Sequence, residues 1–326
     1  YKNDEEAKQI IDIALGLEGL RRQDGIHAAA IVISPDTITK FLPIQQKGSN
    51  AEIVTQYEMH TVEQLGLLKM DFLGLRNLSI VDRTLELIGS ESLDIDNLKL
   101  DDEKTFKLFA EGKMTGVFQL ESRVAQSTSR SLKPKRFEDI VALVALIRPG
   151  PLGAGMHNEF ADRANNRKEI EYLHSDLESI LNETYGVILY QEQVMQIAEK
   201  IAGFNLQEAD NLRVAMGKKI PKVMEEQRKK FTDGAVSNNY SEQFAIELFD
   251  QIAYFAGYGF NKSHSVPYAL LAYQTAYLKA NYPAEYIAAC LTAVKRDKDR
   301  TAIFLSEARD MGCLLYTSDA ADDLVG

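Results

Sequence analysis

The chain has 326 residues, of which 45% are hydrophobic and 26% charged, and its net charge at pH 7 is −11. This composition is typical of an ordinary soluble globular protein, so we do not expect a disordered chain. No apolar run approaches the roughly 18 residues that a membrane helix needs. The two cysteines, Cys290 and Cys313, lack CxxC spacing, so neither a disulfide framework nor a structural zinc site is supported.

The length and the first residues bear on organisation and location. A chain of 326 residues has room for two or more domains. Its first twelve residues are too polar for a signal peptide, so we expect a cytoplasmic protein with no membrane partner. Because the sequence begins at Tyr1 and not at a methionine, we expect a fragment or a processed chain.

The N-terminal quarter mixes helical and strand patterns. Apolar residues recur at helical spacing over 4–23, which predicts a helix. Alanine and β-branched residues fill 25–34 up to Pro35, which favours a strand. Residues 37–43 predict a second short strand or a turn, and the cluster at 48–50 predicts a loop.

The sequence KMDFLGL at 69–75 sets two opposite charges in an apolar segment. We predict a strand over 65–75, and side chains alternate between the two faces of a strand. One face then carries Leu68, Met70 and Phe72, and the other carries Lys69 and Asp71. We expect the three apolar side chains to anchor the strand. The charged pair is either a salt bridge on the solvated face of an edge strand or a catalytic face on a rigid strand.

Helical patterns dominate after residue 76, where we place a domain boundary. An apolar stripe predicts a helix over 77–88, and a buried helix over 137–147 ends at Arg148-Pro-Gly-Pro. Further helices bounded by glycine or proline are predicted at 190–203, 206–219, 221–235 and 266–282. The predicted fold class is therefore α+β and mainly helical.

A polar loop at 257–265 precedes the last of these helices. It carries Asn261, Lys262, Ser263, His264 and Ser265. A helix N-terminus has unpaired N–H groups and a partial positive charge, which favour anions. One of the two serines is expected to cap the helix. The lysine, histidine and asparagine exceed what capping needs, so the loop points to a phosphate-bearing ligand.

The negative total charge hides a local reversal at 213–230. Seven Lys or Arg lie there against two glutamates, which gives a window charge of +5. Arg213 follows Asp210 by three residues, so a helical ion pair is the simple explanation for it. Lys218 and Lys219 come after Gly217, where a helix end favours cations. These explanations do not account for the other cations of the window. The alternative is that the window forms a surface that follows the phosphates of a nucleic acid.

Arg148 lies between an apolar helix and a Pro-Gly-Pro sequence. A rigid turn there would direct its side chain either onto a phosphate or carboxylate or onto the end of the preceding helix. Arg148 alone is weak evidence. Together, the strand that carries a carboxylate, the anion site at the helix N-terminus and the basic helical surface form the inventory for phosphoryl chemistry on a large polyanion. Magnesium usually needs more than one carboxylate, and no second acidic residue stands in an equally strand-like, apolar frame.

Six motifs occur in order and together resemble the C-family DNA polymerases of bacteria. They are KMDFLGLRNLSIVD, VFQLES, ALIRPGPL, ETYGVILYQEQVMQIA, ADNLRVAMGKK and FAGYGFNKSHSVPYALLAYQTAYLKANYPAEY. The resemblance runs from about residue 1 to residue 312. It implies a partial palm similar to that of the nucleotidyltransferase superfamily (polymerase beta-like), followed by a large helical fingers domain.

The same resemblance divides the chain into segments. Residues 1–24 resemble the end of the thumb, residues 25–76 the second palm segment and residues 77–312 the fingers. The segment 313–326 is atypical, and we expect most of it to be foreign sequence, such as translated vector or adaptor, or the product of a frameshift. The other two catalytic aspartates of the family lie N-terminal to the residues present here.

The resemblance also implies roles for individual residues. Asp71 matches the third catalytic aspartate, a magnesium ligand, and Lys69 matches the lysine that faces the incoming nucleotide. Arg213 matches the first of two adjacent arginines near the triphosphate, and the second is replaced by Val214. The candidate nucleotide or phosphate contacts are Arg148, Arg213, Lys218, Lys219, Asn261, Lys262 and His264.

The function implied is template-directed DNA synthesis in bacterial chromosome replication. The expected substrates and partners are deoxynucleoside triphosphates (dNTPs) and primer-template DNA, and in the complete enzyme a sliding clamp, a proofreading exonuclease and clamp-loader subunits. The expected cofactor is Mg²⁺ at a two-metal site, with one ligand in this chain. Two alternatives stay open: a catalytically inert module that binds nucleotide or nucleic acid, and a structural helical scaffold without salt-dependent DNA affinity.

Overall fold

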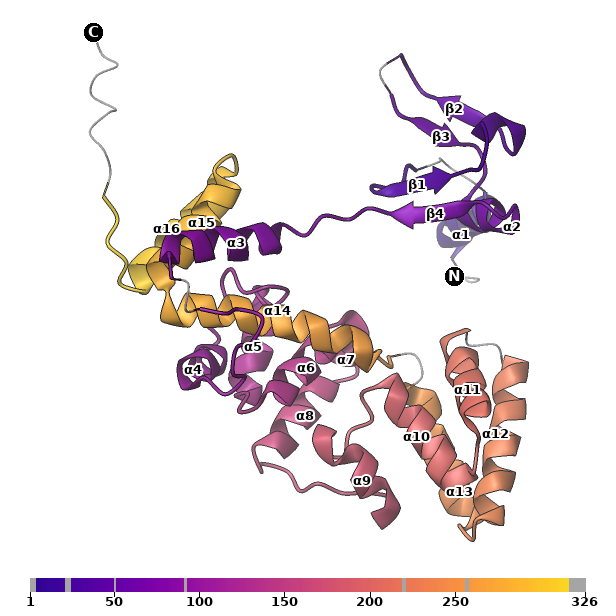
Figure 1. Cartoon of the computed structure of the whole chain (residues 1–326). Coiled ribbons are helices and arrows are strands. Elements are labelled where there is room, and N and C mark those ends of the chain that lie inside the picture. The colour runs from indigo at the N-terminus through magenta and orange to yellow at the C-terminus, as the bar shows by residue number, and fades with distance from the viewer. Residues whose placement is uncertain are drawn as a thin grey trace. The chain divides into compact units, whose positions relative to one another are not determined.

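The structure is a computed structural model that describes residues 4–20, 25–49, 51–90, 93–218, 221–255 and 258–316. The chain divides into two units, Tyr1–Leu75 and Arg76–Gly326 (Figure 1). Helices dominate, and the described strands form two antiparallel sheets of two strands each, which confirms the prediction of a mainly helical α+β chain. Within the described ranges, no helix has the length and apolar character to span a membrane.

The first unit consists of short elements around a small core. They are helix α1 (Glu5–Leu17), strand β1 (Ala30–Ile33), the 3-10 turn η1 (Ile38–Lys40), strands β2 (Ile44–Gln46) and β3 (Ile53–Thr55), helix α2 (Met59–Gln64) and strand β4 (Leu68–Asp71). Strand β1 pairs with β4, and β2 pairs with β3. Leu42, Val62 and Leu67 form the buried core. In the loop predicted at 48–50, Asn50 lies outside the described residues.

Helix α1 is shorter than the helix predicted over 4–23. Asp4 caps it, because its carboxylate accepts a hydrogen bond from the Ala7 amide at 3.1 Å and so satisfies a free N–H group of the first turn. The helix ends at Leu17, and residues 21–24 lie outside the described part of the chain. None of its side chains is buried, so packing within this unit does not stabilise it.

The strand predicted at 25–34 forms only near its end, as β1. The His27 imidazole Nδ1 accepts hydrogen bonds from the Ala29 amide at 3.2 Å and the Ala30 amide at 3.0 Å. These side-chain contacts compete with sheet pairing and turn the chain before the strand begins. Residues 37–43 contain the turn η1, which is the second of the two predicted alternatives.

The second unit is built from helices. In chain order they are α3 (Arg76–Ile88), α4 (Glu103–Glu111), α5 (Arg123–Leu132), α6 (Phe137–Leu146), α7 (Pro149–Gly153), α8 (Met156–Ala164), α9 (Glu178–Leu181), α10 (Gln191–Ala202), α11 (Leu206–Lys218), α12 (Pro221–Ser237), α13 (Glu242–Phe255), α14 (Lys262–Asn281), α15 (Pro283–Val294) and α16 (Lys298–Asp310), with 3-10 turns η2 (Ser175–Leu177) and η3 (Asn182–Thr184). The long helix α14 packs against α3, α4, α6 and α15 (Figure 1). Helices α10 to α13 form a second group with its own core.

Most helices predicted for this unit are confirmed to within a few residues. The helix predicted at 77–88 is α3, and Ile80, Val81 and Thr84 of its apolar stripe are buried. Helix α10 ends at Ala202 and is capped by Gly203, whose φ of 68° is the left-handed conformation that glycine adopts most easily at a helix C-terminus. Apolar spacing and the glycine or proline at the helix ends therefore predict these helices well.

The Pro-Gly-Pro sequence after Arg148 does not form the rigid turn that the sequence predicts. It forms the first turn of the short helix α7, with Pro149 at the first helical position. Proline suits this position because the missing N–H group would have no partner inside the helix. The interruption between α6 and α7 is therefore confined to Ile147 and Arg148.

Gly234 marks a close approach between α12 and α10. A Cβ atom on Gly234 would lie 2.2 Å from the Ala202 carbonyl oxygen, a backbone atom that cannot move cheaply. We expect Gly234→Ala to lower the free energy of unfolding by about 1–3 kcal/mol. Gly217→Ala, on α11, is the matched control, because no described atom lies within 4 Å of its Cβ position. The free energy of unfolding of that variant should be unchanged or rise by up to about 1 kcal/mol, because alanine favours a helix more than glycine does. Urea unfolding of both variants checks this, and equal shifts would contradict it.

Candidate functional site

The predicted charged pair of the first unit lies together on strand β4. The Lys69 ammonium donates to both carboxylate oxygens of Asp71, at 2.8 and 3.0 Å. This hydrogen bond lowers the pKa of Asp71 below its usual value. The carboxylate is therefore ionised at neutral pH, and it shares one face of the sheet with its lysine.

His27 belongs to the same face, although the sequence analysis did not single it out. Its Nδ1 atom lies 3.9 Å from the nearer Asp71 carboxylate oxygen. Asp71 pairs with Ala30 across the sheet, and the backbone turn that His27 stabilises comes directly before that residue. The only sequence signal was a histidine at the start of a predicted strand, and the pairing of β1 with β4 brings it to Asp71.

The expectation that the apolar side chains of β4 anchor the strand is wrong. Leu68, Met70 and Phe72 are 56%, 41% and 59% exposed, whereas the Lys69 side chain is only 17% exposed. The reason lies across the sheet. Val32 pairs with Lys69 and packs on the core of the unit, so the core lies on the face that carries the charged pair. The predicted alternation holds, but the buried face is the opposite one.

These residues do not form a complete magnesium site. Among the described residues, no group of three or more His, Cys, Asp or Glu side chains is placed to hold a metal ion. The close side-chain neighbours of Asp71 are Lys69 and His27, and neither supplies an oxygen ligand. Magnesium prefers several oxygen ligands. Within the described ranges, Asp71 is therefore not part of a cluster of three such side chains.

The predicted anion site of the second unit lies at the N-terminus of α14, but a different residue caps the helix. Asn261 is the cap, because its Oδ1 atom accepts a hydrogen bond from the His264 amide at 2.9 Å. The serine prediction is wrong because the helix begins at Lys262, which places Ser263 inside the first turn. The buried Ser265 hydroxyl instead donates to the Val141 carbonyl at 2.7 Å and ties α14 to α6. Gly257, the first residue of the predicted loop, lies outside the described residues.

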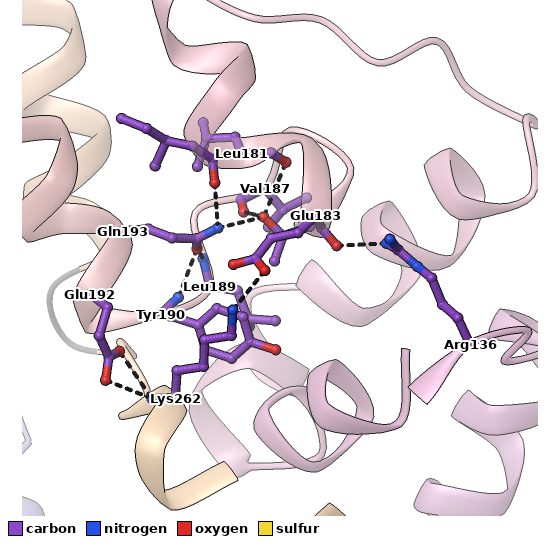
Figure 2. Close-up of polar contacts among 11 residues, drawn as sticks. Arg136, Leu181, Glu183, Val187, Leu189, Tyr190, Glu192, Gln193 and Lys262 are labelled. Atoms are coloured by element: carbon purple, nitrogen blue, oxygen red, sulfur yellow. Dashed lines mark hydrogen bonds and ion pairs between the residues drawn. The ribbon is translucent and has the colours of Figure 1, made fainter. Parts of the chain in front are cut away.

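Two glutamates from elsewhere in the chain bind Lys262 (Figure 2). The Glu183 carboxylate accepts from the Lys262 ammonium at 2.6 Å. Both carboxylate oxygens of Glu192 accept from the Lys262 backbone amide, at 3.0 and 2.9 Å. The ammonium also lies 5.5 Å from the centre of the Tyr190 ring. The first amide of α14 and its neighbouring ammonium are thus both bound by carboxylates of the protein itself.

A network of buried polar contacts holds these glutamates in place (Figure 2). The Gln193 amide oxygen accepts from the Leu189 and Tyr190 amides at 2.8 and 2.9 Å, and its nitrogen donates to the Thr184 hydroxyl at 2.8 Å. Arg136 donates to the Glu183 backbone carbonyl at 2.8 Å. Burial raises the pKa of the Tyr190 hydroxyl, which stays neutral. The backbone around Glu183 is therefore fixed by contacts that do not involve its carboxylate.

His264 lies exposed on the first turn of α14, beside other aromatic rings. Its ring centre is 4.3 Å from that of Tyr268 and 5.6 Å from that of Phe260. Rings on the same helix four residues apart face each other, so this contact follows from helical spacing. The His264 ring is therefore exposed and held by two neighbouring aromatic rings.

Of the two positions predicted for the Arg148 side chain, the structure shows the one at the end of the preceding helix, α6. Its guanidinium donates to the Ala145 carbonyl at 2.9 Å and the Tyr258 carbonyl at 2.6 Å, and it lies 4.3 Å from the centre of the Phe260 ring. Burial lowers the pKa of Arg148. These contacts satisfy the end of α6 and fix the segment that leads to Asn261.

Three of the seven cations in the basic window at 213–230 pair with acids from outside it. The ion pairs are Arg213–Asp210, Arg228–Asp250 and Lys230–Glu208. The Arg213–Asp210 pair is the one that helical spacing predicts, with a distance of 2.8 Å. Counting the three partner acids lowers the local charge from +5 to +2. Lys222 and Lys229 are exposed. The electrostatic case for a surface that follows phosphates is therefore weaker than the sequence window suggests.

The remaining predicted residues lie at the end of α11. Lys218 is the last residue of this helix, and Lys219 lies outside the described residues. Val214 is half-buried beside Arg213. Successive residues of a helix point about 100° apart, so Val214 does not extend the face that Arg213 presents.

A cavity of about 870 Å³ lies along α13 and contains none of the predicted site residues. Ile246, Tyr254 and Phe255 contribute apolar walls, and Glu242 and Glu247 contribute carboxylates. Cavity size alone therefore does not locate the predicted site, which is an open surface at the start of α14.

Comparisons with known proteins identify relatives over nearly the whole chain. Residues 77–239 match the model of the bacterial DNA polymerase III alpha subunit finger domain, and residues 1–74 match the bacterial DNA polymerase III alpha NTPase domain. The chain is 44% identical to DNA polymerase III subunit alpha of Mycobacterium tuberculosis (strain H37Rv) and 46% identical to that of Escherichia coli (strain K12), over 98% of its length in each case. It is 47% identical over 96% of its length to the same subunit of Buchnera aphidicola. The chain spans 27–28% of the length of these relatives.

Proposed function

The chain belongs to the family of bacterial DNA polymerase III alpha subunits, and we propose that it forms part of a DNA-template-directed DNA polymerase. The reaction is transfer of a deoxynucleoside monophosphate to a primer 3′-hydroxyl, with release of pyrophosphate, in chromosome replication in the cytoplasm. The observation that carries the proposal is the match of both units to this family, with Asp71 and Lys69 paired on one strand.

We assign the first unit to the end of the thumb (1–24) and the second palm segment (25–76), and residues 77–312 to the fingers. The division of the chain between Leu75 and Arg76 supports the palm–fingers boundary, as does the gap between the two family matches at 74 and 77. The atypical segment 313–326 is assigned to neither, and residues 317–326 lie outside the described residues.

Asp71 is proposed to supply one ligand of a Mg²⁺ site, and Lys69 to contact the incoming nucleotide. The hydrogen bonds between them support this assignment, because they hold a carboxylate and an ammonium so close together that one metal-bound nucleotide could contact both. Lys69 also balances the charge of Asp71 in the free protein. The other carboxylates of the site are proposed to come from residues outside this chain, which spans 27–28% of the length of these relatives.

The proposed nucleotide contacts of the fingers centre on Lys262. Its ammonium is suited to a phosphate, since a lysine acts as a compact point charge. Asn261 fixes the start of the helix, and the exposed ring of His264 lies two residues after Lys262. Arg213, Lys218 and Lys219 are proposed as further phosphate contacts, and Arg148 as a supporting residue that holds the loop. The complete enzyme would bind primer-template DNA, a sliding clamp, a proofreading exonuclease and clamp-loader subunits.

Primer extension tests the proposal. We expect the 326-residue chain alone to add no nucleotide to a primed template, because it offers a single carboxylate to the metal site. A chain extended to the full length of its relatives should extend the primer and should need Mg²⁺. Extension by the short chain, or none by the long one, would contradict the proposal.

A second function is favoured by the incomplete metal site. The chain as it stands would be an inert module that binds nucleotide or DNA, through Lys262 and the exposed Lys222 and Lys229. Such binding should weaken as salt rises, because each phosphate contact releases counterions. Fluorescence anisotropy of labelled single-stranded DNA at several salt concentrations distinguishes it from a structural scaffold, which would show no salt-dependent affinity.

A further inference from the structure

The Lys262 ammonium already has an anionic partner in the free protein. Glu183 binds it at 2.6 Å, and the two side chains are 31% and 36% exposed, so solvent and ligands can reach the pair. A triphosphate that binds to Lys262 must compete with this carboxylate or accept it as a neighbour of like charge.

The two glutamates at Lys262 differ in what they bind. Glu192 binds the backbone amide of the first residue of α14, where it stabilises the start of a helix. The Glu183 carboxylate binds the side-chain ammonium instead, and its backbone is held separately by Arg136. Loss of the Glu183 charge would therefore leave the loop and the helix in place, whereas loss of the Glu192 charge would disturb them.

We propose that Glu183 is an internal competitor for the triphosphate: its carboxylate occupies the Lys262 ammonium in the free protein and releases it when a dNTP binds. This proposal rests on the proposed role of Lys262 in nucleotide binding. No covalent step is involved, and the exchange replaces one ion pair by another. Glu183 then weakens nucleotide binding, and it keeps the ammonium from pairing with other anions between cycles.

The physical basis is charge. In the Lys262–Glu183 ion pair, the carboxylate offsets the charge of the ammonium that an approaching triphosphate would meet. Glu183→Gln keeps the shape and removes the competing anion, which leaves the Lys262 ammonium without a carboxylate partner. Exposed ion pairs have modest strength, so the expected gain in affinity is about two- to fivefold, and it should shrink as salt screens the charges.

Steady-state kinetics in the full-length enzyme tests the proposal. Glu183→Gln should lower the KM for dNTP by about two- to fivefold, with kcat unchanged. A supporting role for Glu183, in which it positions Lys262, predicts the opposite sign, a higher KM. An unchanged or raised KM in this variant therefore overturns the proposal.

Two further variants separate the possible failures. Lys262→Met should raise the KM for dNTP by at least about tenfold, and Glu183→Gln should have no additional effect in that background. If Lys262→Met leaves the KM unchanged, the proposed role of Lys262 fails and the competition fails with it. If Lys262→Met raises the KM while Glu183→Gln does not lower it, the competition alone is wrong.

Glu247→Gln is the matched control for charge. Glu247 is exposed on α13, outside the Lys262 network, and its substitution removes the same unit of negative charge. Its KM should equal that of the parent enzyme. A drop in KM as large as that of Glu183→Gln would show that the effect comes from total charge, and would overturn the assignment to Glu183.

Discussion

In a chain extended to the full length of its relatives, Asp71→Asn is expected to lower primer extension by at least about 10³-fold. The substitution keeps the size of the side chain and removes the negative charge that a metal ion needs from its ligand. Affinity for primer-template DNA should stay within about twofold, because Asp71 is a single acidic residue on a short strand. Single-turnover extension assays and anisotropy with labelled DNA provide the two measurements.

The first unit offers a matched control for this variant. Asp36 forms a second lysine–aspartate pair with Lys40, the last residue of the turn η1. Asp36→Asn removes the same charge from the same unit at an exposed place away from β4. Its extension rate should stay within about twofold of the parent. Near-normal extension by Asp71→Asn, or an equal loss in both variants, would refute the assignment of Asp71.

The strand that carries Asp71 shows what alternation in a sequence can predict. Alternation correctly places Lys69 and Asp71 on one face, because the two-residue period belongs to the strand itself. It cannot tell which face is buried, since that depends on what packs across the sheet. In this unit Val32 and the Leu42 cluster lie on the charged face, and the apolar side chains of β4 are left exposed.

The start of α14 shows a second limit. Loop composition correctly predicts a helix N-terminus rich in polar groups, and only the capping residue is misidentified. The carboxylates of Glu183 and Glu192 come from positions 79 and 70 residues earlier in the chain. A local pattern contains no information about such partners. For the same reason, the sequence overestimates the free positive charge of the basic window, because the ion-pair partners Glu208 and Asp250 lie outside that window.

Lys279 carries the largest stability effect that we expect in the second unit. This lysine of α14 is fully buried, and its ammonium donates to the Lys113 and Thr115 carbonyls at 2.7 and 2.8 Å. It also binds the Glu307 carboxylate of α16 at 2.6 Å. Burial lowers the pKa of Lys279, and Glu307 opposes this shift. The Lys279 side chain thus joins helix α14 to the segment after α4 and to helix α16.

Lys279→Met should lower the free energy of unfolding by about 3–5 kcal/mol, because it leaves Glu307 without its cation and two carbonyls without donors. Adding Glu307→Gln should restore part of the loss, since the unpaired charge is then removed as well. Lys298→Met, at an exposed position on α16, is the control and should stay within about 0.5 kcal/mol of the parent. Urea unfolding followed by circular dichroism measures all three variants. If Lys279→Met and Lys298→Met unfold at the same urea concentration, the buried ammonium does not hold these helices together.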